Sequence, residues 1–169
     1  GATGNVGRKT IEILEKSNLK VDKLNLLASK KSKGQNLSFR GKEIIVDDLE
    51  NYNFSDANIT FFAAGSKIAE KFALNASKKT CVIDNSKFFR MNTGIPLVVA
   101  EVNPDELNNH KNLISNPNCS TIQLVLTLKP LHDVYKVKRV IVSTYQAVSG
   151  AGKSSMDELI SQSSDVLNG

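Results

Sequence analysis

Short apolar runs alternate with longer segments of helical periodicity along the whole chain. The apolar runs predict β-strands at residues 24–28, 36–39, 43–46, 58–63, 80–84, 96–99 and 138–144, with those at 36–39 and 43–46 paired across Gly41. Amphipathic spacing predicts α-helices at residues 5–17, 67–77, 120–132 and 152–167. Because strands that alternate with helices are typical of a parallel sheet, we expect an α/β fold: a doubly wound, mostly parallel sheet with helices on both faces.

Both ends of this pattern predict a piece of a longer protein. A glycine-rich turn at residue 1 calls for a strand before it, and the chain starts with Gly1 rather than Met. The last predicted helix is followed by no further strand. We therefore expect the translated start to lie upstream and further structure to follow.

The composition of the chain argues against nucleic acids and membranes as partners. The formal net charge of +5 comes from scattered lysines without interleaved aromatic residues, so we expect no nucleic-acid partner. No apolar run reaches the roughly 18 residues of a membrane span, and we expect no membrane partner. The two cysteines, Cys81 and Cys119, are too few for a disulfide framework or a metal site, which favours a reducing, cytoplasmic location.

The first seven residues form a glycine-rich loop ahead of a predicted helix. Gly1, Gly4 and Gly7 are spaced as a variant of the dinucleotide-binding fingerprint, in which the backbone approaches a pyrophosphate and the helix N-terminus offers free N–H groups. A tight glycine turn without a ligand is the alternative. Its place at the head of the alternating pattern favours a Rossmann-like nucleotide-binding fold.

The segment after the first complete strand bears on the choice of cofactor. Residues 28–34 read ASKKSKG and contain no acid to bind ribose hydroxyls, as an NAD site usually does. Ser29, Ser32 and the lysines instead suit a ribose 2′-phosphate. We expect NADP(H), with an exposed lysine-rich loop as the alternative.

Cys119 is the candidate nucleophile. Pro117 disfavours helix at the residue before it, so the next helix should begin close to Cys119, where the helix N-terminus stabilises a thiolate. A thiolate attacks carbonyl carbon. The alternative is a buried structural cysteine, which is how we interpret Cys81 within its apolar strand.

Several segments together resemble the aspartate-semialdehyde dehydrogenase family. They are the glycine loop, VIDNSKFFRM at 82–91, VVAEVNP at 98–104, SNPNCSTIQ at 115–123 and STYQAVSGAG at 143–152. The resemblance spans nearly the whole chain, in the family's order. It implies reductive dephosphorylation of L-aspartyl 4-phosphate to L-aspartate 4-semialdehyde with NADPH, through a cysteine thioester, in the biosynthesis of lysine, threonine, methionine and diaminopimelate.

The resemblance also assigns roles to individual residues. Cys119 is implied as the nucleophile and Gln146 as a catalytic residue that orients the substrate. Arg90, Asn118 and Gln146 are implied to bind substrate or phosphate. The implied cofactor-binding residues are Gly1, Thr3, Gly4, Asn5, Val6, Ser29, Ser32, Ala64, Gly65, Asn85, Ser149 and Gly150. No metal ligand is implied.

Three features depart from the family pattern. Lys87 and Phe88 stand where smaller residues are usual, and Ala63 stands where serine is often found. The family needs a general-base histidine, and neither His110 nor His132 is at its position. The resemblance implies an NADP-binding domain at residues 1–118, the start of a catalytic and dimerisation domain at residues 119–169, and a homodimer or homotetramer when the protein is full length.

Two other functions remain open. N-acetyl-γ-glutamyl-phosphate reductase shares the fold and the chemistry, but its usual glycine before and tyrosine after the nucleophile are replaced by Asn118 and Ser120. A dinucleotide-binding module without catalytic activity is the second alternative.

Overall fold

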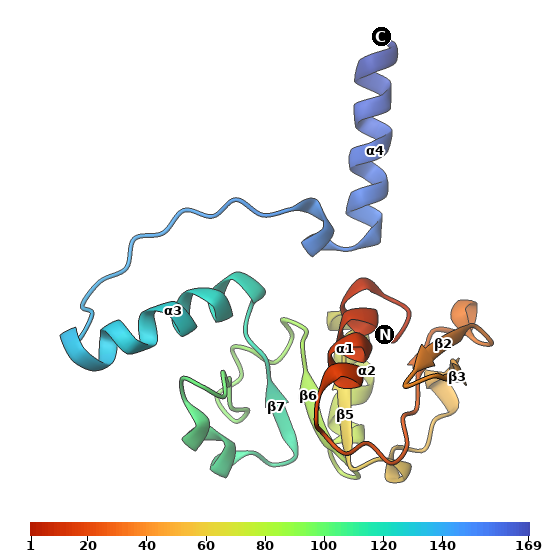
Figure 1. The fold of residues 1–169 in the computed structure, drawn as a ribbon, viewed down its shortest axis with the longest axis horizontal. Helices are drawn as coiled ribbons and strands as arrows, with labels where there is room; N and C mark the ends of the chain where they lie inside the picture. The colour runs from red at the N-terminus through yellow and green to blue at the C-terminus, as the bar shows by residue number, and fades with distance from the viewer.

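The computed structural model describes residues 1–169, which form seven short strands and four α-helices (Figure 1). The strands are β1 (Leu27–Ala28), β2 (Asn36–Phe39), β3 (Lys42–Ile45), β4 (Asp47–Asp48), β5 (Ile59–Phe62), β6 (Cys81–Asp84) and β7 (Leu113–Ser115). The helices are α1 (Asn5–Lys16), α2 (Ser66–Ala76), α3 (Cys119–Tyr135) and α4 (Lys153–Asn168). All four predicted helices are therefore present, each within a few residues of its predicted bounds.

Parallel pairing dominates the strands. β6 lies between β5 and β7 in a parallel sheet, and β1 pairs with β4, again in parallel. β2 and β3 form the predicted antiparallel hairpin, with Phe39 opposite Lys42. The predicted α/β class with a mostly parallel sheet is confirmed.

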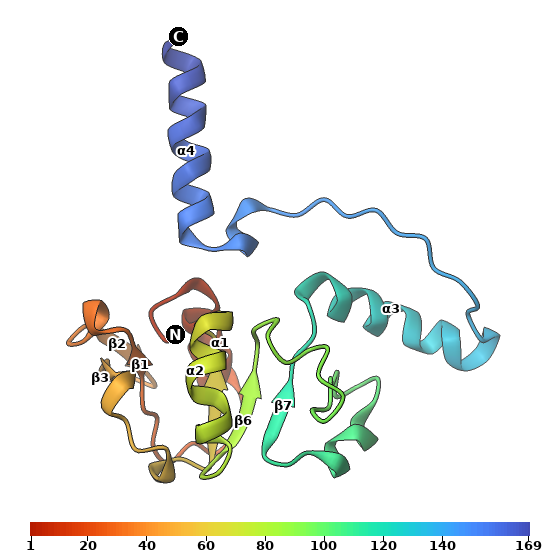
Figure 2. The ribbon, with the colours of Figure 1, turned by 180° about the vertical axis from the view of Figure 1, so that it is seen from behind.

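Helices cover both faces of the sheet. α1 lies in front of β5 in Figure 1, whereas α2 lies in front when the molecule is seen from behind in Figure 2. Two apolar clusters hold these layers together. α2 packs the small side chains Ala69, Ala73 and Ala76 against Phe62 and Val82, while Ile11 of α1 packs in a second cluster with residues of β1, β2 and Val46.

The strand predicted at residues 24–28 shortens to Leu27–Ala28, two other predicted strands do not form, and β4 and β7 were not predicted. Residues 96–99 form a single bridge, Leu97 to Ser115, because Pro96 has no N–H to donate to a ladder. Residues 138–144 are extended and exposed, since no other strand of the chain lies beside them. β7 was not predicted, because its three residues follow the polar stretch 108–112 and make too short an apolar run to recognise.

A groove of about 390 Å³ separates the two parallel parts of the sheet. Residues 24–27 and 59–64 line its two sides, and Ile11 and Leu14 of α1 line its floor. β1 and β5 each pair with only one neighbour, so the groove lies between their two free edges. Gly1 also lines this groove, and its nitrogen donates to the Leu27 carbonyl at 2.8 Å.

Two adjacent phenylalanines have opposite environments. Phe89 is 2% exposed within the cluster formed with α2, whereas Phe88 is 41% exposed and meets Phe89 edge to face. Phe89 is therefore part of the core, whereas Phe88, which departs from the family pattern, is largely solvated.

We predict that Phe89→Ala lowers the free energy of unfolding by about 3–5 kcal/mol, because it removes a buried ring and leaves a cavity. The matched variant Phe88→Ala should cost well under half as much, since that ring is largely solvated already. Urea denaturation followed by circular dichroism measures both. Equal losses for the two variants would contradict the assignment of Phe89 to the core.

Candidate active site

The carboxyl ends of the parallel strands gather the predicted site residues at one edge of the sheet. Ala64 and Gly65 follow β5, Asn85 follows β6, and the turn to Cys119 follows β7. Asp84 pairs with both Phe62 and Ser115, so the three strands end at the same level. This edge is where open parallel sheets bind ligands.

The glycine loop reaches this edge through close backbone packing. The Ala2 N–H donates to the Leu27 carbonyl at 3.0 Å, which ties the loop to β1. A Cβ on Gly7 would overlap the carbonyl oxygen of Gly1, and a Cβ on Gly1 would overlap the carbonyl of Ala63. Both positions therefore require glycine, and Gly4, Asn5 and Val6 are left exposed at the start of α1.

This loop fits a dinucleotide pyrophosphate. No side chain caps the N-terminus of α1, so its first N–H groups remain available to an anion. Thr3 lies beside the loop, and its hydroxyl donates to the Ser32 hydroxyl at 3.3 Å. The structure thus brings the glycine loop and the segment predicted to bind the 2′-phosphate together.

The segment after β1 is basic, but one of its lysines is already in an ion pair. Ser29 precedes the 3-10 turn Lys30–Ser32 and is exposed. Lys33 forms an ion pair of 3.0 Å with Asp47, and the hydrogen bond between them raises the pKa of Lys33 and lowers that of Asp47. Lys30 and Lys31 form no ion pair, so they keep their charge available to an anion.

Gly65 owes its identity to the backbone. Its φ of +82° lies in a region that favours glycine, and nothing lies within 4 Å of where its Cβ would be. Gly65 is also the residue that precedes α2, whose N-terminus no side chain caps. The conformation, rather than crowding by the protein, explains this glycine.

Asn116 connects two predicted site residues. Its side-chain amide donates to Asn85 Oδ1 at 2.6 Å, and its carbonyl accepts from Arg90 Nε at 2.9 Å. Arg90 also donates through Nη2 to the carbonyl of Asn85 at 3.2 Å. Two of the five guanidinium N–H groups are thus fixed on backbone carbonyls, and three remain for an anion. The sequence analysis missed Asn116, although it lies within the nucleophile motif.

Cys119 is the first residue of α3, as predicted, and its thiol is exposed. Asn118 caps the helix: its Oδ1 accepts from the N–H groups of Ser120 at 3.0 Å and Thr121 at 3.4 Å. This capping role was not predicted. Because the cap occupies Oδ1, the Nδ2 group of Asn118 is left to donate to a bound anion.

Gln146 lies beside the thiol. Its Nε2 is 3.9 Å from Cys119 Sγ, although the two residues are far apart in sequence. Ser149 and Gly150 follow in an exposed 3-10 turn, Val148–Ala151, that leads into α4. Met156 of α4 lies 3.8 Å from the side-chain amide of Asn5, so the start of this helix lies near the glycine loop.

Neither histidine serves the thiol. His110 Nδ1 accepts from the backbone N–H of Asn112 at 3.1 Å. His132 lies in the last turn of α3, which places it about 20 Å along the helix axis from Cys119. No hydrogen bond of the structure joins either histidine to Cys119 Sγ, whose side-chain contact is with Gln146.

Comparison with known proteins identifies the family. Residues 1–110 match the family model for the semialdehyde dehydrogenase NAD binding domain, and residues 128–169 match the model for the semialdehyde dehydrogenase dimerisation domain. The chain belongs to the semialdehyde dehydrogenase family. These matches confirm the resemblance inferred from the sequence. They also confirm that the chain contains a nucleotide-binding domain.

Relatives named aspartate-semialdehyde dehydrogenase match along the chain. The enzyme of Shewanella violacea is 46% identical over 100% of this chain and 51% of its own length. The crystal structure of aspartate semialdehyde dehydrogenase II from Vibrio cholerae, also known complexed with ASA, superposes with a TM-score of 0.92 at 44% identity, covering 99% of this chain and 51% of that one. The Candida albicans enzyme with NADP gives a TM-score of 0.65 at 29% identity, covering 79% and 45%. The chain thus spans about half the length of these relatives.

Two further observations concern metals and membranes. No three histidine, cysteine, aspartate or glutamate side chains gather as a metal-binding group. None of the four helices combines the length and the apolar character that crossing a bilayer requires.

We predict that a thiol reagent such as iodoacetamide labels Cys119 well before Cys81 at neutral pH. Cys119 is exposed, whereas Cys81 is half-buried and burial raises the pKa of its thiol, which lowers its thiolate fraction. Peptide mass spectrometry after timed labelling measures both rates, and the Cys81→Ala variant should retain the fast phase. Faster labelling of Cys81 would contradict the structure.

Proposed function

We propose that the full-length protein containing this chain is an NADP-dependent aspartate-semialdehyde dehydrogenase that reduces L-aspartyl 4-phosphate to L-aspartate 4-semialdehyde. The observation that carries the proposal is the exposed Cys119 thiol at the start of α3, with the Gln146 amide 3.9 Å from it. A nucleophile beside a polar positioning group, at the edge that carries the glycine loop, suits acyl transfer coupled to hydride transfer.

Cys119 provides covalent catalysis. In the oxidative direction its thiolate adds to the aldehyde carbon and forms a C–S bond, and the new alkoxide takes a proton. Loss of hydride and that proton leaves an acyl thioester on Sγ. Phosphate then attacks the thioester carbon and breaks the C–S bond, which releases the acyl phosphate and regenerates the thiolate. NADP⁺, when bound, accepts the hydride.

Three other side chains hold the reactants in this proposal. Gln146 orients the substrate through the amide that lies beside Sγ. Arg90 binds phosphate with the N–H groups that its backbone contacts leave unused, and Asn118 adds its Nδ2 donor. The cofactor contacts a set of residues at the strand ends and in the glycine loop: Gly1, Thr3, Gly4, Asn5, Val6, Ser29, Ser32, Ala64, Gly65, Asn85, Ser149 and Gly150.

The same proposal divides the chain and assigns its assembly. Residues 1–118 constitute the NADP-binding domain, and residues 119–169 begin the catalytic and dimerisation domain. The matched family models, over 1–110 and 128–169, support this division and an oligomer, a homodimer or homotetramer. We place the activity in amino-acid biosynthesis leading to lysine, threonine, methionine and diaminopimelate, in the cytoplasm.

We predict that Cys119→Ala in the full-length protein lowers kcat by at least about 10³-fold, because Cys119 is the proposed site of the thioester and the other thiol of residues 1–169, Cys81, is half-buried. NADPH formation from aspartate semialdehyde, NADP⁺ and phosphate measures it. The matched Cys81→Ala variant should stay within about twofold of wild type, and NADPH binding should persist in both.

Substantial turnover by Cys119→Ala would refute covalent catalysis at this residue. Wild type should also be assayed with N-acetyl-γ-glutamyl phosphate. Preference for that acyl phosphate would establish the rival reductase, and cofactor binding without turnover of either substrate would establish the non-catalytic module.

We predict negligible turnover when residues 1–169 are expressed alone. His132 lies in the last turn of α3 and His110 makes no hydrogen bond to Cys119, so no histidine of residues 1–169 is in place to take the proton of the thiohemiacetal. The same coupled assay, run at high protein concentration after gel filtration, measures this. Robust phosphate-dependent NADPH formation by residues 1–169 would contradict it.

A further inference from the structure

Arg8 is a cation in an electrostatically unfavourable position. It lies in the opening turns of α1, where the helix dipole disfavours positive charge, and the first turn contains no acidic residue. Its Nε donates to the carbonyl of Thr3 at 3.0 Å, which turns the exposed guanidinium back over the glycine loop. The ion pairs of the structure do not include Arg8.

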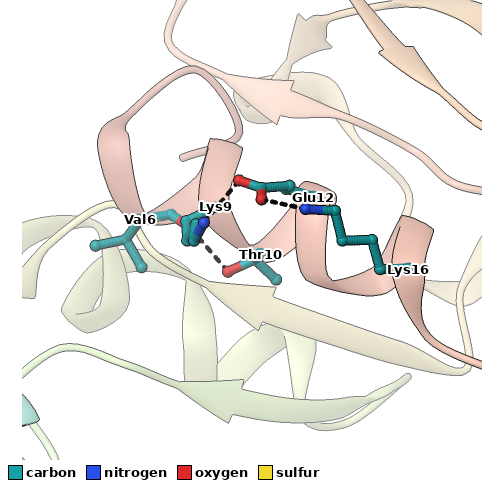
Figure 3. Close-up of polar contacts among 5 residues, drawn as sticks. All are labelled: Val6, Lys9, Thr10, Glu12 and Lys16. Atoms are coloured by element: carbon teal, nitrogen blue, oxygen red, sulfur yellow. Dashed lines mark hydrogen bonds and ion pairs between the residues drawn. The ribbon is translucent and has the colours of Figure 1, made fainter.

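The carboxylate one helical turn after Arg8 already pairs with two lysines. Glu12, four residues after Arg8, accepts from Lys9 and Lys16 at 2.8 Å each (Figure 3). These hydrogen bonds, that from Lys16 most strongly, lower the pKa of Glu12 to about 2. Glu15, the next acid of α1, accepts instead from the backbone N–H of Arg40. Lys9 and Lys16 thus share the carboxylate of Glu12, whereas Arg8 forms no ion pair.

The guanidinium lies on the side of α1 that carries the segment after β1. Arg8 lines a shallow pocket of about 170 Å³ with Leu37 and Ser38 of β2, the strand that follows this segment, and with Glu12 and Glu15 of its own helix, which already accept hydrogen bonds from other donors. Its hydrogen-bond partner Thr3 contacts Ser32 through the 3.3 Å hydroxyl contact. Thr3 therefore links Arg8 to Ser32, through its carbonyl on one side and its hydroxyl on the other.

We propose that Arg8 binds the 2′-phosphate of the adenosine ribose of NADP(H), together with Ser29 and Ser32, and so determines specificity for NADP(H) over NAD(H). The inference rests on the proposed NADP-dependent function. A guanidinium presents several N–H groups in a fixed fork that matches phosphate oxygens, and Arg8 has no ion pair that a phosphate would have to break. The pyrophosphate, by contrast, is common to both cofactors and is served by the uncapped backbone N–H groups of α1.

The test compares two ligands that differ only in the 2′-phosphate, 2′,5′-ADP and 5′-AMP, bound to the full-length protein in isothermal titration calorimetry. The variants are Arg8→Ala and Lys9→Ala, which remove the same charge from adjacent residues. We expect Arg8→Ala to weaken 2′,5′-ADP binding by about 10-fold or more, as loss of charge-assisted hydrogen bonds does. Binding of 5′-AMP should stay within about twofold, and Lys9→Ala should change neither affinity appreciably.

Three results would overturn the assignment. If Arg8→Ala matches Lys9→Ala while wild type still prefers 2′,5′-ADP, the NADP proposal stands and Arg8 has no part in it. An equal loss with both ligands would place Arg8 away from the 2′-phosphate. If wild type itself shows no preference for 2′,5′-ADP, both proposals fail. Thermal melting checks that the variants fold, and Arg8→Gln, which keeps the stem and loses the charge, should repeat the selective loss.

Discussion

The parallel register of β5, β6 and β7 is the constraint on which the rest of the candidate site depends. Because Phe62, Asp84 and Ser115 lie at one level, the residues that follow each strand emerge together. The ladder continues one step further on both sides of β6, where Asn85 donates to Phe62 and Asn116 donates to Asp84. Backbone hydrogen bonds therefore position Asn85 and Asn116 before any side-chain contact forms between them.

Hydrogen bonds among three residues at the strand ends hold the turn that precedes Cys119; the residues are Asn85, Arg90 and Asn116. The side chains of the two asparagines pair, and Arg90 spans both of their carbonyls, so the turn leading to Pro117 and Cys119 is held from two directions. Asn118 then begins α3 by capping it. The exposed thiol is thus the first side chain beyond a rigid connection, whereas its partner Gln146 approaches on an extended, exposed segment.

Much of the fold could be predicted from the sequence, for reasons visible in particular elements. α1 and α2 carry one apolar face each, and the hairpin β2–β3 alternates around Gly41, so periodicity sufficed. Residues 138–144 show the limit of that argument: apolar, β-branched residues predict a strand, but a strand also needs a neighbour with free hydrogen-bonding groups. β7 has such a neighbour in β6 and forms with only three residues.

The candidate site, too, could be predicted from the sequence only in part. Its position at the strand ends follows from parallel topology, so Cys119 at the start of a helix and the glycine loop beside β1 could be predicted. The contacts of Asn116 and Arg8 could not, because each depends on where a side chain meets a carbonyl or hydroxyl from a distant part of the chain. Motif reasoning also could not show that Lys33 is paired with Asp47 while Lys30 and Lys31 are not.

The burial of Phe89 has an evolutionary consequence. The residue contributes to the apolar cluster under α2, and the very next residue is Arg90, whose guanidinium faces the strand-end edge. In the proposed function Arg90 binds phosphate, so selection for folding and selection for anion recognition act on neighbouring codons, and an insertion or deletion at this turn would disturb both. New specificity is more readily acquired in the exposed segment 29–34, where substitutions leave the apolar cores intact.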